Sequence, residues 1–144
     1  MTEVEYTDEF GNWWNELTQA EQESVGYGVG LLEAKGPTLG HPYSSGVEGS
    51  RHSHMRELRV QHQGRPYRLF YAFDPRRAAI LLIAGDKTGD RRFYERMTPI
   101  ADRLYDEHLE QLKGEGLSQG MHSPSATQRR SKRWPDRSRS YATA

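Results

Sequence analysis

The feature that most constrains the fold is an alternation of apolar and polar residues on either side of a tight turn. Leu58 and Val60 alternate with polar residues, and the run 67–73 alternates again after the turn Gln-Gly-Arg-Pro at 63–66. Because successive side chains of a strand point to opposite faces, this pattern predicts an antiparallel hairpin. The apolar run 78–84 follows a second turn and predicts a central strand.

Helical patterns flank these strands. Apolar residues at i, i+3, i+4 and i+7 within 10–17 predict a first helix, and Thr18 with Glu21 forms a capping box that begins a second one. Residues 91–112 predict a C-terminal helix, in which Pro99 marks either a kink or a new start. The sequence therefore predicts an α+β fold with two N-terminal helices, a small and mainly antiparallel sheet and a C-terminal helix.

The length of 144 residues favours one domain, and an apolar content of 34% predicts a small core. After Gly114 the composition shifts to Ser, Arg, Gly and Gln with almost no aliphatic residues. We expect a folded domain over 1–113 and a basic tail over 114–144, which is disordered from Met121 onwards.

Composition excludes several classes of protein. The chain has no Cys, which rules out a disulfide scaffold, a thiolate zinc site and a cysteine nucleophile. The longest apolar run is far shorter than a membrane span, and the acidic residues 1–8 do not form a signal peptide. We expect a soluble cytoplasmic protein with no membrane partner.

The formal net charge of zero conceals a strong asymmetry. The net charge is −8 over 1–50, +6 over 51–97, −2 over 98–113 and +4 over 114–144. A basic block of this kind acts locally on a polyanion, because salt confines charge effects to about 10 Å. The alternative is that acidic helices and an arginine-rich sheet simply solvate the surface.

Several cations and one phenol are expected near a single edge of the sheet. The hairpin carries Arg59 and Arg68, and the segment after the central strand adds Lys87, Arg91, Arg92 and Tyr94. This set suits RNA cleavage by a 2′-hydroxyl, since guanidinium groups stabilise the charge that gathers on the phosphoryl oxygens. Tyr94 can transfer a proton if neighbouring cations lower its pKa from about 10. The alternative is that these arginines are surface residues and Tyr94 belongs to the core.

Four segments together resemble the RelE/HigB-type toxins of bacterial toxin–antitoxin pairs. They are Met-Arg-Glu-Leu-Arg-Val at 55–60, Tyr-Arg-Leu-Phe-Tyr-Ala-Phe-Asp at 67–74, Ala-Ile-Leu-Leu-Ile-Ala-Gly-Asp-Lys at 79–87 and Phe-Tyr-Glu at 93–95. The Gly-Pro-x-Leu-Gly of 36–40 also resembles HigB-like members. The resemblance covers 3–113 and implies a RelE-like fold and a ribosome-dependent mRNA endoribonuclease without metal or other cofactor. It also implies neutralisation by a helix-turn-helix antitoxin.

The resemblance also assigns roles. By position, it places the catalytic arginine on Arg68, the preceding basic residue on Arg59 and the tyrosine on Tyr94, with Lys87 in the turn. The nearby Arg56, Arg91 and Arg92 are then RNA-binding.

The chain departs from RelE-like members at Glu57 and Thr88, where those toxins carry basic residues. HigB-like toxins use His and acidic residues there, which adds His54, Asp86 and Asp90 as candidates. Which residue is the base and which the acid stays open.

Two other functions stay open. ParE-like toxins share the fold and bind DNA gyrase without nuclease residues, and a decayed toxin acts only as an antitoxin-binding module. The spacing of His52 and His54 is typical of metal ligands, but a loop with several His is more often just polar. We therefore predict no metal, and His54 is a better proton donor than ligand.

Overall fold

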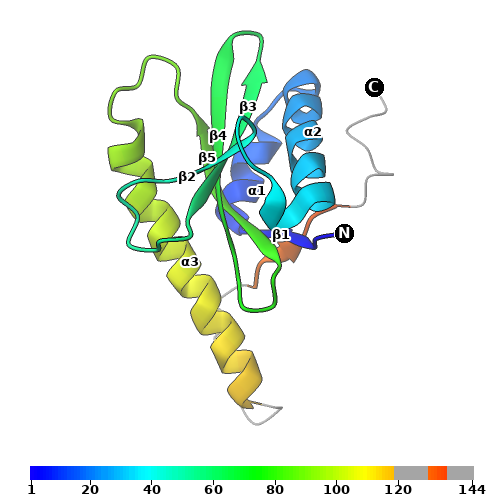
Figure 1. Ribbon diagram of the computed structural model, residues 1–144, viewed down its shortest axis with the longest axis vertical. Coiled ribbons are helices and arrows are strands. Elements are labelled where there is room, and N and C mark those ends of the chain that lie inside the picture. Colours follow the sequence, from blue (N-terminus) through cyan, green and yellow to red (C-terminus); the bar gives the residue numbers. More distant parts are fainter. Residues whose placement is uncertain (119–129, 136–144) are drawn as a thin grey trace.

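The computed structural model describes residues 1–118 and 130–135, which form one sheet between two helical layers (Figure 1). The strands are β1 (Val4–Tyr6), β2 (Ser44–Gly46), β3 (Arg56–His62), β4 (Arg65–Phe73), β5 (Ala79–Asp86) and β6 (Lys132–Arg133). The helices are α1 (Asp8–Asn15), α2 (Gln19–Lys35), the short 3-10 helix η1 (Gly36–Thr38) and α3 (Phe93–Ser118). None of the described helices has the length and apolar character that crossing a membrane requires.

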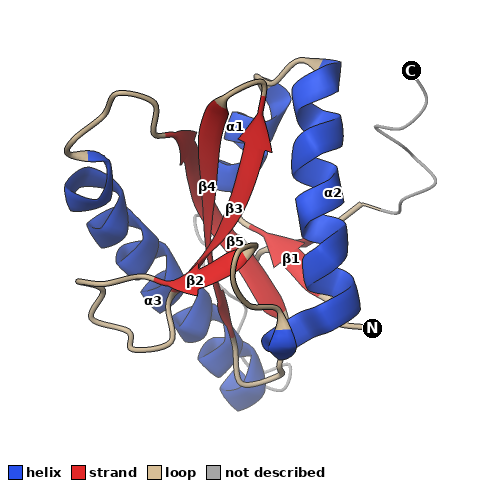
Figure 2. Cartoon of the chain, turned by 45° about the horizontal axis from the view of Figure 1, so that its top comes forward, coloured by secondary structure: helices blue, strands red, loops and turns tan. Residues whose placement is uncertain are grey.

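The sheet confirms the predicted α+β class. Its strand order is β2-β3-β4-β5-β1-β6, and every neighbouring pair is antiparallel except β1 and β5. The predicted hairpin is β3–β4, with Arg56 opposite Tyr71 at one end and His62 opposite Arg65 at the other. The N-terminal helices cover one face of the sheet and α3 covers the other (Figure 2).

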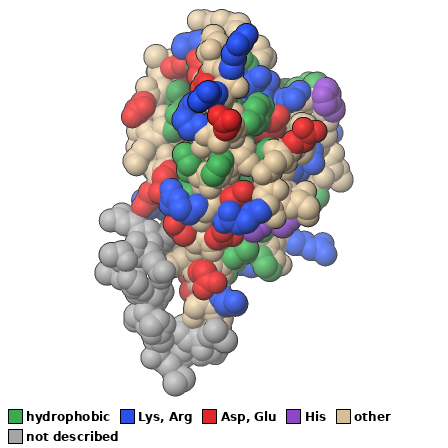
Figure 3. All heavy atoms as spheres, turned by 90° about the vertical axis from the view of Figure 1, so that its left-hand side faces the viewer, with side chains coloured by type: hydrophobic (Ala, Val, Ile, Leu, Met, Phe, Trp, Pro, Cys, Tyr) green, Lys and Arg blue, Asp and Glu red, His purple; other side chains and the backbone are tan. Residues whose placement is uncertain are grey.

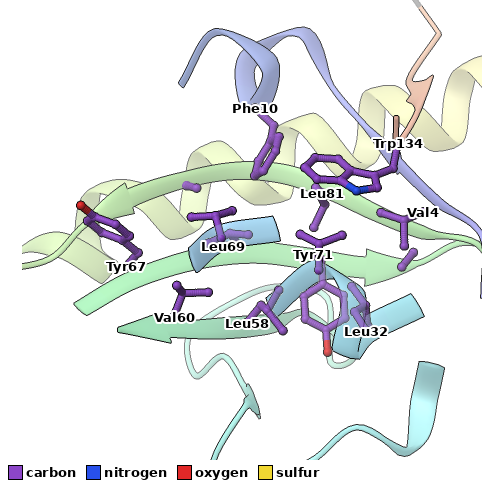
Figure 4. Close-up of a cluster of buried hydrophobic side chains, with 14 of the residues drawn as sticks. Val4, Phe10, Leu32, Leu58, Val60, Tyr67, Leu69, Tyr71, Leu81 and Trp134 are labelled. Atoms are coloured by element: carbon purple, nitrogen blue, oxygen red, sulfur yellow. The ribbon is translucent and has the colours of Figure 1, made fainter. Parts of the chain in front are cut away.

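Each face of the sheet has its own hydrophobic core. On the side of α1 and α2, Phe10 and Leu32 pack against Leu58, Leu69 and Leu81 (Figure 4). On the other side, residues of α3 pack against the alternate residues of the same strands. This second core includes Phe70, Ala72, Ile80, Leu82, Phe93, Met97, Ala101 and Leu104. The two-residue period of the hairpin therefore separates the cores, as the sequence predicts.

The helix ends agree with the sequence. The Thr7 side chain caps α1, and Thr18 and Glu21 form the predicted capping box of α2. Pro99 lies inside α3, so a single helix runs through it and ends six residues beyond the predicted Leu112. Met97 and Ala101 are buried on either side of Pro99, and this packing holds the helix continuous where a backbone hydrogen bond is lost.

The segment 36–53, which is rich in Gly, Pro, Ser and His, contains η1 and the short strand β2. Its later part is attached to α3 by polar contacts. His52 Nε2 lies 2.8 Å from an Asp106 oxygen, and the Arg51 backbone donates a 3.1 Å hydrogen bond to Asp102. The later part of this segment is therefore anchored to the middle of α3.

Part of the predicted tail is ordered, which corrects the expectation of disorder from 121 onwards. Residues 132–133 form β6, antiparallel to β1, and the Trp134 backbone donates a 2.7 Å hydrogen bond to the Val4 carbonyl. The Trp134 ring is 6% exposed and packs against Tyr6, Phe10 and Trp14. Basic residues next to Trp134 form ion pairs with acidic residues of the N-terminal half, and one of these pairs joins Arg133 to Glu3. The rest of the predicted tail, 119–129 and 136–144, lies outside the described residues.

Candidate active site

The β3–β4 pairing places Arg59 directly opposite Arg68. Phe70 belongs to the core on the α3 side, and Arg68 precedes it by two residues on the same strand, so the Arg68 side chain lies on the α3 face of the sheet. Arg59 is directly opposite Arg68 and therefore lies on the same face. Like charges directly opposite each other are destabilising in a sheet. A counter-charge is therefore required at this position.

Glu57 supplies that counter-charge. It precedes Arg59 by two residues on the same strand and the same face. Its Oε2 accepts a 3.2 Å hydrogen bond from Arg59 Nε, and its Oε1 lies 3.9 Å from Arg68 Nε. The Glu57 side chain is 4% exposed, so its charge is almost fully removed from water.

The first turn of α3 adds a phenol to the same carboxylate. The Tyr94 hydroxyl donates a 2.6 Å hydrogen bond to Glu57 Oε1. Lys87, in the loop before the helix, places its ammonium 5.8 Å from the centre of the Tyr94 ring. We call these five residues the Glu57 cluster: Glu57, Arg59, Arg68, Lys87 and Tyr94.

The pKa of Tyr94 is raised above its ordinary value of 10, first because the group is buried and then because it donates to the Glu57 carboxylate. Arg68 acts in the opposite direction but does not outweigh these two causes. The condition under which the sequence analysis lets Tyr94 transfer a proton, a pKa lowered by neighbouring cations, is therefore not met. Tyr94 keeps its proton at neutral pH and is suited to donate it.

Arg68 has an unused donor. Its Nη1 donates a 3.0 Å hydrogen bond to the carbonyl of Tyr67, while the buried Nε makes no hydrogen bond within the described chain. A buried donor without an acceptor costs about 1–3 kcal/mol. This Nε is enclosed by protein and faces Glu57 Oε1 at 3.9 Å, so it reaches an incoming anionic oxygen only if the Arg68 side chain moves away from Glu57.

Two of the predicted site residues lie elsewhere. His54 contacts Tyr105, with 3.1 Å between Nε2 and the hydroxyl, and Tyr105 lies about 16 Å farther along α3 than Tyr94. Arg56 points to the opposite face of the sheet, where its Nε donates a 3.0 Å hydrogen bond to Ser44 Oγ. Neither residue joins the Glu57 cluster.

The remaining predicted cations, Arg91 and Arg92, lie in the exposed segment just before α3. Arg92 forms a loose ion pair with Glu95 at 3.7 Å. The acidic candidates of this loop are engaged by other cations, Asp90 by Arg96 at 2.7 Å and Asp86 by Arg65 at 3.5 Å. Figure 3 shows the corresponding surface, where Lys and Arg side chains are interspersed with Asp and Glu.

Glu57 is a functional candidate that the sequence analysis does not predict, since it marks there only a departure from RelE-like toxins. The sequence does contain a pattern that indicates Glu57. The two-residue alternation places Glu57 on the same face as Arg59, and the hairpin register places Arg68 opposite Arg59 on that face. Within 1–118 and 130–135, no three acidic or histidine side chains gather in a way that suits a metal ion.

Comparison with known proteins gives a consistent family. The model of the family described as phage-derived protein Gp49-like (DUF891) matches residues 12–106. The chain is similar to two proteins of Mycobacterium tuberculosis (strain ATCC 25618 / H37Rv). It is 43% identical to putative toxin HigB2 over 103 residues, which are 70% of this chain and 51% of that protein. It is 41% identical to putative toxin HigB3 over 105 residues, which are 72% of this chain and 90% of that protein. The chain thus spans about half the length of HigB2. No solved structure matches.

Proposed function

Because the chain belongs to the Gp49-like family and to the HigB-like toxins of the RelE superfamily, we propose that it is the toxin of a toxin–antitoxin pair and cuts mRNA on the ribosome. The observation that carries the nuclease activity is the Glu57 carboxylate, which contacts both the Tyr94 hydroxyl and the Arg59 guanidinium. A base, an acid and a phosphate-binding cation thus share one small site.

The reaction joins the 2′-oxygen of one nucleotide to the adjacent phosphorus and breaks the bond from phosphorus to the 5′-oxygen. Glu57 takes the proton from the 2′-hydroxyl, and Tyr94 gives its proton to the leaving 5′-oxygen. The products are a 2′,3′-cyclic phosphate and a 5′-hydroxyl. Since Tyr94 and Glu57 are hydrogen-bonded, the proton on Glu57 passes back to Tyr94 and restores both groups.

The cations of the cluster stabilise the charge of the transition state. The Arg59 guanidinium gives up its contact with Glu57 and donates to a phosphoryl oxygen, and the Arg68 guanidinium does the same once its side chain moves away from Glu57. Arg59 suits this exchange because a third of its side chain is exposed. Lys87 adds a third positive charge, and Arg91 and Arg92 bind the flanking RNA backbone.

The partners of this function are translating ribosomes with their mRNA, which places the activity in the cytoplasm, and a neutralising antitoxin of the helix-turn-helix class. The names of both similar proteins as HigB toxins support an antitoxin partner. The antitoxin neutralises the toxin by covering the basic surface around Arg59.

One observation favours a second candidate. Arg59 is already paired with Glu57, an arrangement that also suits a toxin that binds DNA gyrase and cleaves nothing. The two functions differ in their first effect, since the nuclease stops protein synthesis first and the gyrase binder stops DNA replication first.

The test is induction of the full-length chain in a host without antitoxin, followed by mapping of mRNA 5′ ends on translating ribosomes. The full chain is used because 130–135 contributes to the fold. New cuts at a fixed position within codons, absent with Glu57→Gln and Tyr94→Phe, are the expected result. Growth arrest without new cuts rejects the nuclease in favour of gyrase binding, and no arrest points to a decayed toxin.

A further inference from the structure

A groove of about 790 Å³ opens beside the Glu57 cluster, between α2 and the outer edge of β3. Strand β2 covers that edge only over Arg56–Leu58, and from Arg59 onwards no strand within 1–118 and 130–135 pairs with it. Arg59 and Arg68 line the groove together with residues of α2. The groove is therefore continuous with the two arginines to which we assign phosphate binding.

Two tyrosine rings line this groove and are unusually exposed. Tyr27 of α2 is 68% exposed and Tyr43, just before β2, is 47% exposed. Apart from Met1, these are the exposed large apolar side chains of the described chain. Tyr43 is held beside the cluster, because its carbonyl accepts a 2.8 Å hydrogen bond from the Arg59 backbone.

We propose that this groove binds an unpaired RNA base next to the scissile phosphate, with Tyr43 and Tyr27 as stacking surfaces. This assignment rests on the proposed ribonuclease function and specifies where that substrate lies. A phosphate held by Arg59 and Arg68 brings the neighbouring nucleotide to the groove. Base–aromatic stacking contributes about 1–3 kcal/mol per base and tolerates any sequence.

The polar lining suits a base rather than a second phosphate. Glu23 lines the groove. Its carboxylate repels phosphate but can accept a hydrogen bond from an amino group on a base. Ser24 and His62, which are 2.7 Å apart between Oγ and Nδ1, add groups for the hydrogen-bonding edge of a base. These groups allow the groove to distinguish one base from another.

The continuity of the groove with Arg59 and Arg68 favours RNA over a protein partner. An extended peptide strand that paired with the open edge of β3 would use backbone groups near Gln61 and would not require the arginines. A peptide partner is therefore an outcome to be tested against the RNA assignment.

The experiment uses the full-length chain and ribosomes programmed with mRNAs that differ in one base of the A-site codon. Single-turnover cleavage is measured for the wild type, Tyr27→Ala and Tyr43→Ala. We expect each alanine variant to lose at least about fivefold in kcat/KM, the lower end of the stacking contribution, and to show smaller rate differences among the four bases. Phe at either position restores a stacking ring and should recover the loss. The matched control is Arg103→Ala, an exposed residue of α3 whose side chain pairs with Glu107.

The salt dependence separates this subsite from the phosphate contacts. The slope of log kcat/KM against log salt should stay at its wild-type value in the tyrosine variants, since they remove no cation. Unchanged rates and base preference in both alanine variants would overturn the assignment while leaving the ribonuclease standing. Normal cleavage combined with weakened antitoxin binding would overturn it in favour of a protein interface. A wild type that cleaves no codon rejects the ribonuclease and the subsite together.

Discussion

The Tyr94 hydroxyl and the Glu57 carboxylate, from the first turn of α3 and from β3, meet in a 2.6 Å hydrogen bond on the face that carries Arg59 and Arg68. This contact joins a proton donor to a proton acceptor, two residues that are 37 positions apart in the chain. Burial of the hydroxyl is the larger cause of the raised pKa of Tyr94, and the hydrogen bond to the Glu57 carboxylate raises this pKa further.

Replacement of the carboxylate tests the assigned base. Glu57→Gln keeps the shape of the side chain but removes the group that accepts the 2′-hydroxyl proton, so we expect cleavage on ribosomes to fall by about 10²–10⁴-fold. The control is Glu107→Gln on exposed α3, which also removes one negative charge. Wild-type cleavage by Glu57→Gln, measured by 5′-end mapping, would show that Glu57 is not the base.

Tyr94→Phe tests the assigned acid. Loss of the hydroxyl should lower the single-turnover rate by about 10²-fold or more while the circular dichroism spectrum stays unchanged. Because burial and the Glu57 carboxylate raise the pKa of Tyr94 above its ordinary value, the wild-type rate should show no decline from this residue between pH 7 and 9. A decline between pH 7 and 9 that disappears in Tyr94→Phe would contradict the raised pKa.

The fold was largely predictable because both cores follow simple periods. The alternation at 56–73 gives β3–β4, and the capping box at Thr18 gives the start of α2. The docking of β6 could not be predicted from periodicity, because two paired residues and one aromatic ring form no repeating pattern. Trp134 is held in place by contacts with residues more than 100 positions earlier in the chain. Such contacts cannot be predicted from the composition of the residues around Trp134.

The site was predictable in part for a related reason. Cross-strand register places Arg59 beside Arg68, and that register follows from the turn. The distance of His54 from Tyr94 depends instead on where the loop before β3 attaches to α3, through His52 and Asp106. The sign of the Tyr94 pKa shift depends on burial, which a charge count along the sequence does not measure.

Two glycines of α2 provide a matched test of its packing on the sheet. A Cβ at Gly28 would lie 2.9 Å from Cγ2 of Val60, a buried and stiff side chain, whereas a Cβ at Gly30 meets nothing within 4 Å. We expect Gly28→Ala to lower the free energy of unfolding by about 1–2 kcal/mol through overpacking. Gly30→Ala should raise it by about 0.5–1 kcal/mol through helix propensity. Urea unfolding of both variants measures the difference, and equal effects would contradict the close approach.

Acid stability should depend on the pair formed by Glu21 and Tyr67. The Tyr67 hydroxyl donates to Glu21, and this bond, with the other hydrogen bonds of Glu21, lowers the pKa of the carboxyl from 4.5 to about 2. A lowered pKa in the folded state stabilises the protein above pH 4.5, and this contribution is lost as the pH falls towards 2. Tyr67→Phe should cost about 1.5–3 kcal/mol at pH 7, with a difference from wild type that shrinks below pH 4.5. A difference that stays constant from pH 7 to pH 2.5 would show that the hydroxyl does not act through Glu21.

The segment 130–135 is docked on the domain through the ring of Trp134. Trp134 fills a space among Tyr6, Phe10 and Trp14, so Trp134→Ala should lower the free energy of unfolding by about 3 kcal/mol or more through lost burial and a residual cavity. Lys132→Ala serves as the control, because that side chain is 57% exposed and its 3.5 Å pair with Asp8 contributes at most about 1 kcal/mol. Thermal unfolding of the full-length variants gives both values. If Trp134→Ala were as stable as Lys132→Ala, the segment would not be part of the folded domain, and the domain would end with α3.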